Sequence, residues 1–311
     1  MSTPERPADA VQGPLHAPAV AQVREAMRLF DDGAEAFVEA SDAVWNVVGQ
    51  ASAAAASPPL DGVVLDACAG AGASALPLAR AVGPHGYVDA VDLSPRLTAY
   101  GTRAAHDAGL GNVAFHSADI LDWAAQHVDS YDRIVCTLGL MFLPDPAAAM
   151  TAFADALRPG GRVTVTTWAA GAMQPLTGCL WQARLDLGVP APPPAPFAAS
   201  VTATEDPGRL LEQATAAGFA QPHVDVYRQS LTVNGEVGWA LVTGTVLRGL
   251  ITDLTETQLG QVRGRLAQGL ADSGNRVDGT TLTLRAQRAN ADRDTHPGAP
   301  RRASRRRKRP V

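Results

Sequence analysis

The sequence predicts an α/β fold: a doubly wound, mostly parallel, seven-stranded sheet with an antiparallel edge strand and a helical lid. Two observations predict it. Short runs of β-branched and apolar residues alternate with helical segments between residues 62 and 168, and a glycine-rich turn directly follows the first run. Alternation of this kind is typical of doubly wound sheets, whose parallel strands are buried on both faces. It stops after Trp168, so the later segments predict the lid and the sheet edge.

Five segments have the composition of parallel strands. They are residues 62–67, 87–93, 113–120, 131–140 and 162–168. The first, fourth and fifth have nearly continuous β-branched cores, which indicates burial on both faces. Three helix starts are marked by Ser94-Pro95, Asp145-Pro146 and Asp206-Pro207, where a capping side chain precedes a proline at the first helical position.

The elements expected after Trp168 are less regular. They are an amphipathic stretch at 175–188, a proline-rich linker at 190–196, a helix at 208–217, a strand at 223–233, a largely helical region at 236–270 and a last strand at 280–288. We predict that the two late strands pair antiparallel at the edge of the sheet. The helices between them have no place in the sheet, so we expect them to cover one end as a lid.

The chain therefore divides into five parts. They are a disordered lead-in at 1–18, an N-terminal helical segment at 19–59, a cofactor-binding core at 60–170, a lid insertion with edge strands at 171–290, and a disordered basic tail at 291–311. The N-terminal segment carries apolar residues at helical spacing. We expect its Phe30, Phe37 and Trp45 either to close over the bound cofactor or to pack on the sheet.

Charge argues against a general nucleic-acid binder. The 311 residues carry a net charge of −5, but seven of the 26 basic residues lie in residues 301–311, which contain no acid. The acidic body cannot neutralise phosphates, on which such binding mainly depends. We interpret the tail as a solvated extension. The preference for arginine over lysine, with abundant alanine, indicates a GC-rich bacterial coding sequence.

Cysteine usage and hydropathy predict a cytoplasmic protein. Cys68, Cys136 and Cys179 have neither a disulfide pattern nor metal-ligand spacing, so no metal site is expected. No run of 18 apolar residues occurs, and the N-terminus lacks the order of a signal peptide. We expect no membrane and no nucleic-acid partner, and the sequence leaves a homodimer open.

The glycine-rich turn at VVLDACAGAGASALPL (residues 63–78) is the most informative stretch. Gly70 and Gly72 allow the backbone to turn sharply and lie against a ligand, and the following helix directs free N–H groups at it. Gly70-x-Gly72-x-x-Ala75, with Asp92 20 residues past Gly72, also satisfies the dinucleotide fingerprint. A nicotinamide- or flavin-dependent oxidoreductase is therefore one alternative.

Three features favour a different cofactor. Asp66, near the end of the first strand, is placed to meet an ammonium group, and Asp119, after the third strand, is placed to accept from an adenine amino group. The fifth strand is followed by an irregular region and not by a second nucleotide-binding half.

The motifs VLDACAGAG, DAVDLSP, SADILDW, YDRIVCTLGLMFLPDP and LRPGGRVTVTTW resemble those of class I S-adenosylmethionine-dependent methyltransferases, specifically the small-molecule branch that includes the ubiquinone and menaquinone methyltransferases. The resemblance is strong over residues 63–168 and weak as far as residue 288. It implies a Rossmann-like sheet and S-adenosylmethionine as the cofactor. None of these motifs specifies a substrate.

The resemblance also implies roles for ten residues. Asp66 and the backbone of residues 68–72, including Cys68, Gly70 and Gly72, would hold the methionine part of the cofactor; Asp92 would bridge the ribose hydroxyls; Leu93, Asp119 and Ile120 would contact the adenine; and Thr137 and Leu138 would line the region of the sulfonium. Cys68 departs from the family's usual glycine. We expect it to be tolerated because backbone contacts survive if φ is negative there.

No catalytic residue is identified from the sequence. Methyl transfer needs mainly alignment and exclusion of water, and a general base only for some acceptors. Candidate residues of the substrate pocket are Met141, Phe142, Trp168, Trp181 and Tyr227.

The sequence thus predicts methyl transfer to O, N or C of a small, largely apolar molecule, such as a specialised metabolite or a quinone-like compound, by in-line displacement. The other alternative beside the oxidoreductase is a protein that binds S-adenosylmethionine without transferring a methyl group, as a cyclase or a binding module would.

Overall fold

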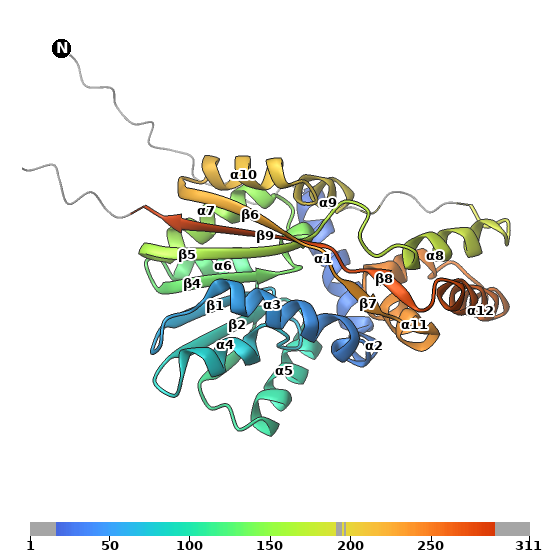
Figure 1. Ribbon diagram of the computed structural model, residues 1–311, viewed down its shortest axis with the longest axis horizontal. Helices are drawn as coiled ribbons and strands as arrows, with labels where there is room; N and C mark the ends of the chain where they lie inside the picture. Colours follow the sequence, from blue (N-terminus) through green and yellow to red (C-terminus); the bar gives the residue numbers. More distant parts are fainter. Residues whose placement is uncertain (1–16, 191–194, 196, 290–311) are drawn as a thin grey trace, which may run out of the picture.

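The computed structural model describes residues 17–190, 195 and 197–289 (Figure 1). The basic tail at 291–311 and residues 1–16 of the predicted lead-in lie outside these residues. Helix α1 begins at Ala17, two residues earlier than the expected boundary.

A seven-stranded sheet forms the centre of the molecule, in the order β3-β2-β1-β4-β5-β9-β6. Its strands are β1 Val63–Ala67, β2 Tyr87–Asp92, β3 Val113–Ser117, β4 Tyr131–Thr137, β5 Leu157–Trp168, β6 Phe219–Tyr227 and β9 Thr281–Arg288. Strands β1 to β5 pair in parallel, and β9 pairs antiparallel with both β5 and β6. The mostly parallel seven-stranded fold is confirmed. The antiparallel strand, however, lies one position inside the edge, where β6 is the outermost strand.

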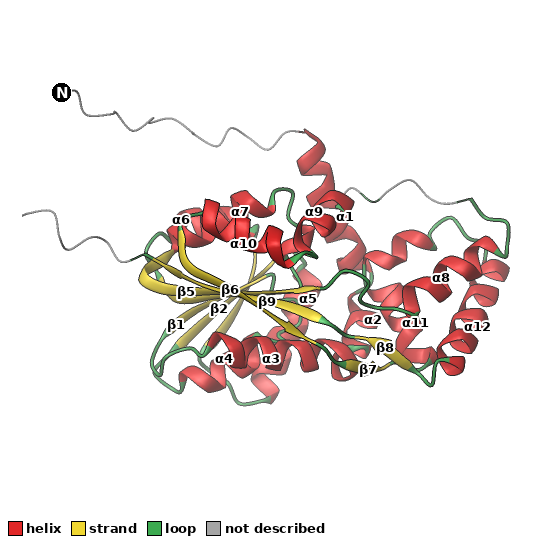
Figure 2. Ribbon diagram, turned by 45° about the horizontal axis from the view of Figure 1, so that its top comes forward, coloured by secondary structure: helices red, strands yellow, loops and turns green. Residues whose placement is uncertain are grey.

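Helices cover both faces of the sheet (Figure 2). One face carries α6 Ile120–Gln126, α7 Pro146–Ala156 and α10 Pro207–Ala216, and the other carries α3 Asn46–Ala56 and α4 Ala75–Val82. Helix α5 Pro95–Asp107 packs against β2 and β3. Apolar side chains of β1 and β4 alternate between these two layers: Leu65 and Ile134 pack toward α7, and Val64 and Val135 toward α3 and α4. This burial of both faces explains the continuous apolar strands of the sequence.

The three predicted helix starts are confirmed by their side-chain bonds. Ser94 Oγ accepts a hydrogen bond from Leu97 N at 3.1 Å. Asp145 Oδ1 accepts from Ala147 N and Ala148 N, each at 3.0 Å. Asp206 Oδ1 accepts from Arg209 N at 2.9 Å. Each bond satisfies N–H groups that the helix itself leaves unpaired, so these positions fix where the helices start.

A second layer of structure lies beyond the carboxyl ends of the parallel strands (right of Figure 1). It comprises α8 Leu176–Leu185, α9 Ala198–Thr204, α11 Gly235–Gly244, η3 Val246–Leu250, α12 Glu256–Asp272, and the small sheet of β7 Ser230–Thr232 and β8 Arg276–Asp278. The N-terminal elements α1 Ala17–Asp32, α2 Ala34–Glu39 and the π-helical turn η1 Ser41–Trp45 lie between it and the sheet.

The lid has a hydrophobic core of its own, and the N-terminal elements share it. Leu176 and Leu180 of α8, Leu241 of α11 and Leu266 of α12 are buried together with Val44 of η1. Helices α2 and α11 approach so closely that a Cβ on Gly244 would lie 2.3 Å from the backbone nitrogen of Phe37. The first and the later segments of the chain therefore form one continuous cover.

Two sequence expectations in this region are wrong. The strand expected at 223–233 is two strands in different sheets, because β6 ends at Tyr227 and β7 pairs with β8. Helix α9 was not predicted. No helix in the described part of the chain is both long and apolar enough to span a membrane.

Candidate active site

Two cavities open side by side at the carboxyl ends of the parallel strands. One has a volume of about 100 Å³ and the other about 340 Å³. Both are lined by Phe30, Cys68, Asp92, Gly139 and Phe142, so they meet at the ends of β1, β2 and β4. Open α/β sheets bind their ligands at this edge. The predicted cofactor residues occur in both cavities: Leu93, Asp119 and Ile120 line the smaller one. The larger one is lined by Gly70, Thr137 and Leu138 together with the predicted substrate residues Met141, Phe142 and Trp168.

The glycine turn forms one wall of the larger cavity. Gly70 and Gly72 have φ values of +54° and +96°, a region that favours glycine. A Cβ on Gly72 would lie 2.9 Å from the ring of Phe115, so no larger residue fits there. Gly70 therefore brings the backbone of the turn to the cavity, whereas Gly72 lines neither cavity and packs against Phe115.

Asp92 stands where the two cavities meet. Its Oδ2 accepts from Gly70 N at 2.8 Å and its Oδ1 from Ser94 N at 2.9 Å. Burial raises the pKa of this carboxyl, and the two backbone N–H groups oppose that shift. Asp92 thus ties the glycine turn to the end of β2 while it faces both cavities.

Cys68 adopts a conformation that the sequence analysis did not anticipate. Its φ is +60°, so the expected negative φ is wrong, and the cysteine occupies a conformation typical of glycine. Its side chain fits because Gly139 stands opposite: a Cβ there would lie 2.3 Å from that of Cys68. A hydrogen bond with Cys136, burial and neighbouring charges raise the pKa of the Cys68 thiol, which opposes a role as a nucleophile.

Asp66 does not line either cavity. It is fully buried behind the glycine turn, where both carboxylate oxygens accept from Ser74 Oγ at 2.9 and 2.8 Å. Burial raises its pKa from 3.8 to about 7, although the Ser74 bond opposes this. In this structure Asp66 acts through Ser74, which does line the larger cavity.

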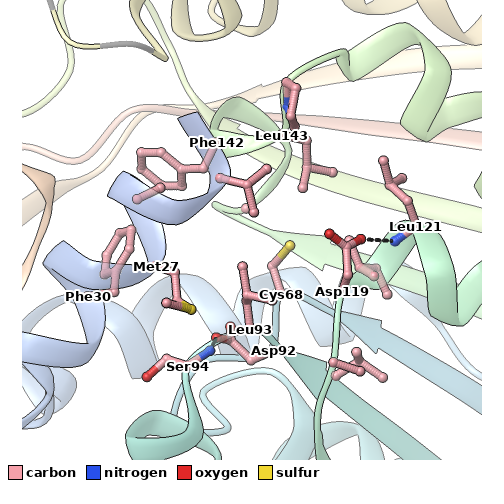
Figure 3. A pocket seen from close by; sticks show the side chains of 17 residues that line it. Met27, Phe30, Cys68, Asp92, Leu93, Ser94, Asp119, Leu121, Phe142 and Leu143 are labelled. Carbon is pink, nitrogen blue, oxygen red and sulfur yellow. Dashed lines mark hydrogen bonds between the residues drawn. The ribbon is translucent and has the colours of Figure 1, made fainter. Parts of the chain in front are cut away.

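The smaller cavity gathers the residues predicted to contact adenine (Figure 3). Leu93, Asp119 and Ile120 all line it. Asp119 caps α6, and its Oδ1 accepts from Leu121 N at 2.8 Å. Figure 3 shows this carboxylate on the side of the cavity opposite Met27 and Phe30 of α1.

Helix α1 closes the smaller cavity with Val23, Ala26, Met27 and Phe30. It is fastened to the start of α5 by Asp31, whose Oδ1 accepts from Ser94 Oγ at 2.7 Å and from Arg96 N at 3.1 Å. The expectation that the N-terminal segment lies over this site agrees with the contacts of Phe30, and Phe37 and Trp45 line the larger cavity.

Thr137 and Leu138 line the larger cavity at the end of β4. Thr137 Oγ1 donates to Ser52 Oγ at 2.8 Å, and Ser52 is bonded to Thr166 at 2.9 Å. Leu138 has a φ of +56°, and its N–H donates to Thr166 O at 2.7 Å. The chain therefore turns away from the sheet here in a strained conformation that one backbone bond holds in place.

Aromatic side chains form a wall along the two cavities. Phe30, Phe37, Trp45, Phe142 and Phe197 form a continuous series of ring contacts, with centroids between 4.8 and 6.0 Å apart. These rings come from α1, α2, η1, η2 Leu140–Phe142 and the start of α9. Segments far apart in the sequence therefore meet in one wall.

Three of the five predicted substrate residues line the larger cavity, namely Met141, Phe142 and Trp168. The other two predictions do not hold. Trp181 and Tyr227 line neither cavity, and they are 38% and 46% exposed. The buried side chains of α8 include Leu180 and Arg184, and Arg184 is bonded to Asp253.

Some lining residues were not found from the sequence. They are Phe197, Val201 and Glu205 around α9, Met173 and Thr177 before and within α8, and Leu241, Thr245, Val246 and Leu247 around the end of α11. The only sequence feature recognised near Glu205 was Pro207, and it predicted the start of α10 but no cavity residue. None of the described histidines lines either cavity. No group of three potential metal ligands gathers among the described residues.

The comparison with protein families decides what this site belongs to. Residues 64–161 match the family described as "Methyltransferase domain". These residues form a methyltransferase domain. The match covers β1 to the start of β5, and it contains Asp66, Cys68, Asp92, Asp119 and Thr137. It supports S-adenosylmethionine as the cofactor.

Similar proteins include small-molecule O-methyltransferases. The chain is 28% identical over 207 residues to nocamycin O-methyltransferase of Saccharothrix syringae, which covers 60% of this chain and 70% of that protein. It is 38% identical over 110 residues to a ubiquinone biosynthesis O-methyltransferase of Xylella fastidiosa, which covers 35% of this chain and 43% of that protein. The second similarity spans less than half of that relative and falls mainly on the methyltransferase domain.

Most of the chain is similar in fold to the YcgJ protein of Bacillus subtilis. Its solved structure has a TM-score of 0.53 and 15% identity to this chain, and it covers 79% of this chain and 99% of that protein. The similarity in fold therefore includes residues outside the methyltransferase domain.

The site next to the methyltransferase domain's glycine turn fits S-adenosylmethionine on its own chemistry. The turn presents backbone without a side chain at Gly70, and Asp92 offers carboxylate oxygens to ribose hydroxyls. Leu93 and Ile120 provide apolar contacts, and Asp119 provides a hydrogen-bond acceptor, as an adenine requires.

Proposed function

We propose that the protein transfers a methyl group from S-adenosylmethionine to a small, largely apolar molecule. The observation that carries this proposal is the pair of adjoining cavities. The smaller one has the acceptors and apolar contacts that suit a nucleoside, and the larger one is lined chiefly by aromatic and aliphatic side chains. They meet at Asp92, Cys68 and Gly139, so a cofactor bound across this junction faces a ligand in the rest of the larger cavity.

In this proposal the cofactor lies across the junction. The carboxylate oxygens of Asp92 already accept hydrogen bonds from Gly70 N and Ser94 N. Their remaining lone pairs accept hydrogen bonds from the ribose hydroxyls. Leu93, Ile120 and Asp119 hold the adenine, and the turn from Cys68 to Ser74 holds the amino-acid end. Thr137 and Leu138 face the reacting end. Asp66 positions this turn through Ser74 and makes no direct contact.

The lining of the larger cavity supports a small apolar acceptor. No lysine, arginine or histidine lines it within the described part of the chain. A phosphorylated or nucleic-acid acceptor would need such cations. The relatives named for nocamycin and for ubiquinone biosynthesis also act on small molecules, and we extend that class to this chain. We propose O, N or C as the methylated atom, without choosing among them. Association of two copies is a prediction from the sequence.

When bound, S-adenosylmethionine supplies a methyl group carried on a positively charged sulfur. The protein's own residues align the acceptor and exclude water, which can contribute about 7–11 kcal/mol to the rate. The aromatic wall defined above, Met141 and Trp168 form an apolar enclosure for that purpose. Helix α1 covers the opposite side, so the reacting groups are shielded from both directions.

Calorimetric titration with S-adenosylmethionine and with NADH tests the cofactor. We expect saturable binding of the first and none of the second. Binding of NADH alone would replace this proposal with the oxidoreductase.

A screen of small apolar acceptors with a labelled methyl donor then tests the transfer. The label should pass to at least one acceptor. Cofactor binding with no labelled product, but with a rearranged substrate, would favour a cyclase that holds the cofactor without using its methyl group.

A further inference from the structure

Glu205 is a carboxylate on the wall of the larger, otherwise mainly apolar cavity. It follows the last residue of α9 and is partly buried. Within the described part of the chain, its side chain makes no hydrogen bond and no ion pair. The neighbouring Asp206, by contrast, is exposed and caps α10. The two adjacent acids thus have different surroundings, and only Glu205 lines the cavity.

The backbone at Glu205 is held against the end of β5. Ala170 N donates to Glu205 O at 3.2 Å, and Thr167 Oγ1 donates to Thr204 O at 2.9 Å. Gln213 Nε2 of α10 donates to Ala203 O at 2.9 Å. These bonds place Glu205 beside the segment from Trp168 to Ala172, which also lines the larger cavity. Its position is therefore set by the sheet and not by a free loop.

Most other polar side chains that line this cavity already have partners. Asp92 is bonded to two backbone N–H groups, Ser74 to Asp66, and Thr137 to Ser52. Thr245 Oγ1 donates to Leu241 O at 2.7 Å. Asp92 and Glu205 are the two carboxylates of the lining, and Asp92 lies at the cofactor junction. Glu205 is thus the unpartnered charge on the acceptor side.

The indole N–H of Trp168 is also without a hydrogen-bond partner among the described residues. The acceptor side therefore offers one strong acceptor at Glu205 and one donor at Trp168. A charge in apolar surroundings is costly unless a partner satisfies it. A ligand with an O–H or N–H group would satisfy Glu205, and a ligand with a carboxylate would add a second negative charge beside it.

We propose that Glu205 selects the methyl acceptor by charge: it accepts a hydrogen bond from an O–H or N–H group and rejects carboxylates. This inference rests on the proposed function, because it assumes that the larger cavity holds the acceptor. It narrows the acceptor class to planar or aliphatic apolar molecules with a hydroxyl or an amine near Trp168. Glu205 acts here as a specificity-determining residue.

Binding of three matched probes tests the selection. Naphthol, naphthylmethylammonium and naphthoate share one apolar ring system and differ in the group offered to Glu205. Each is titrated by calorimetry into protein saturated with S-adenosylhomocysteine. For the wild-type protein we expect naphthoate to bind at least about tenfold more weakly than the other two, because its carboxylate and that of Glu205 repel each other.

The substitution Glu205→Gln removes the charge and keeps the shape. We expect it to bring naphthoate to within about threefold of naphthol and to weaken naphthylmethylammonium. Glu205→Ala should also remove the discrimination, so the result does not depend on the new amide. Glu212→Gln, on the exposed surface of α10, is the matched control and should leave all three affinities unchanged.

Two results would overturn the inference: discrimination that persists in both Glu205 variants, or wild-type protein that binds no probe at millimolar concentration. Failure of the proposed function looks different. In that case S-adenosylhomocysteine would not bind, while the charge discrimination among probes would still be measurable without it. The affinity for S-adenosylhomocysteine should be the same in wild type and in Glu205→Gln, because Glu205 lies outside the cofactor junction.

Discussion

The two adjoining cavities are built in different ways. The cofactor side uses the ends of β1, β2 and β4, where backbone N–H groups and short polar side chains are bonded to each other, as Asp92 is to Gly70 and Ser94. The acceptor side uses side chains from α1, α2, η1, η2 and α9, which meet mainly through ring contacts, with one hydrogen bond from Trp45 Nε1 to Phe37 O. The first is a hydrogen-bonded scaffold, and the second is a packed apolar enclosure.

This difference indicates how each side tolerates change. A hydrogen-bonded scaffold loses several partners when one member is removed, because buried polar groups are costly to leave unsatisfied. A packed enclosure can be reshaped by volume-conserving substitutions at modest cost. We therefore expect the cofactor side to be sensitive to single substitutions and the acceptor side to change mainly in what it binds.

The largest effect on cofactor affinity is expected from Asp92→Ala. The substitution removes the acceptor for Gly70 N and Ser94 N and the carboxylate at the junction of both cavities. Affinity for S-adenosylmethionine, measured by calorimetry, should fall at least about a hundredfold, or about 2.8 kcal/mol. Asp119→Asn should lower this affinity by about tenfold or less, since the amide keeps an oxygen that can cap α6. Equal losses of affinity in the two variants would contradict a larger contribution of Asp92 to cofactor binding.

Asp66→Asn should change how stability depends on pH. Burial raises the pKa of Asp66 to about 7, so the folded protein holds this proton more tightly than the unfolded chain does. The resulting stability is complete below pH 3.8 and is lost as the pH rises through about 7. At about 1.4 kcal/mol per pH unit, the loss is up to about 4 kcal/mol.

Urea unfolding of wild type and Asp66→Asn between pH 4 and 8 measures this difference. The wild type should lose stability relative to the variant across that range. Ser74→Ala should extend the loss to higher pH, because the Ser74 bond lowers the pKa of Asp66. Parallel curves for wild type and Asp66→Asn would show that Asp66 keeps its ordinary pKa.

Asp31→Ala tests whether Asp31 holds α1 over the two cavities. Without its bonds to Ser94 and Arg96, α1 should detach more readily, and cofactor affinity should fall about five- to tenfold. Trypsin cleavage at Arg24 and Arg28 should become faster. Asp32→Ala is the matched control, since Asp32 pairs only with Arg28 of the same helix among the described residues. Equal cleavage rates for the two variants would argue against a fastening role for Asp31.

The smallest effect is expected at Cys68. Both Cys68→Gly and Cys68→Ala lose the thiol, but only alanine keeps a Cβ at a φ of +60°. The glycine variant should therefore be more stable than the alanine variant by about 1 kcal/mol in urea unfolding. An alanine variant of equal or higher stability would mean that the turn relaxes to another conformation. Cofactor affinity should differ little between them.

The cofactor side could be predicted because local motifs encode it. A strand, a glycine turn and an acid after the next strand follow each other within 30 residues, and their parallel strands bring them together at one edge. The φ of Cys68 could not be predicted in the same way, since the usual residue there is glycine and the space that admits a side chain comes from Gly139, 71 positions later.

The acceptor side could be predicted only in part. Met141, Phe142 and Trp168 follow strand ends and were found, whereas α9 has small residues, AASVTAT, without a periodic apolar stripe. Glu205 was missed with it. For α8, Trp181 was a candidate for the pocket, whereas the buried polar side chain of this helix is Arg184, which bonds to Asp253 and Leu250 O. Such long-range pairing leaves no local signal.

The position of β9 also bears on how this chain is made. It is the last described strand, yet it lies between β5 and β6, both of which precede α11 and α12 in the sequence. During synthesis, β5 and β6 therefore leave the ribosome with open edges, and the sheet is completed only after residue 288 has emerged. Strands with unpaired edges associate readily with other chains. A chain that stops before β9 should therefore accumulate as aggregate, even though the whole methyltransferase domain has been synthesised.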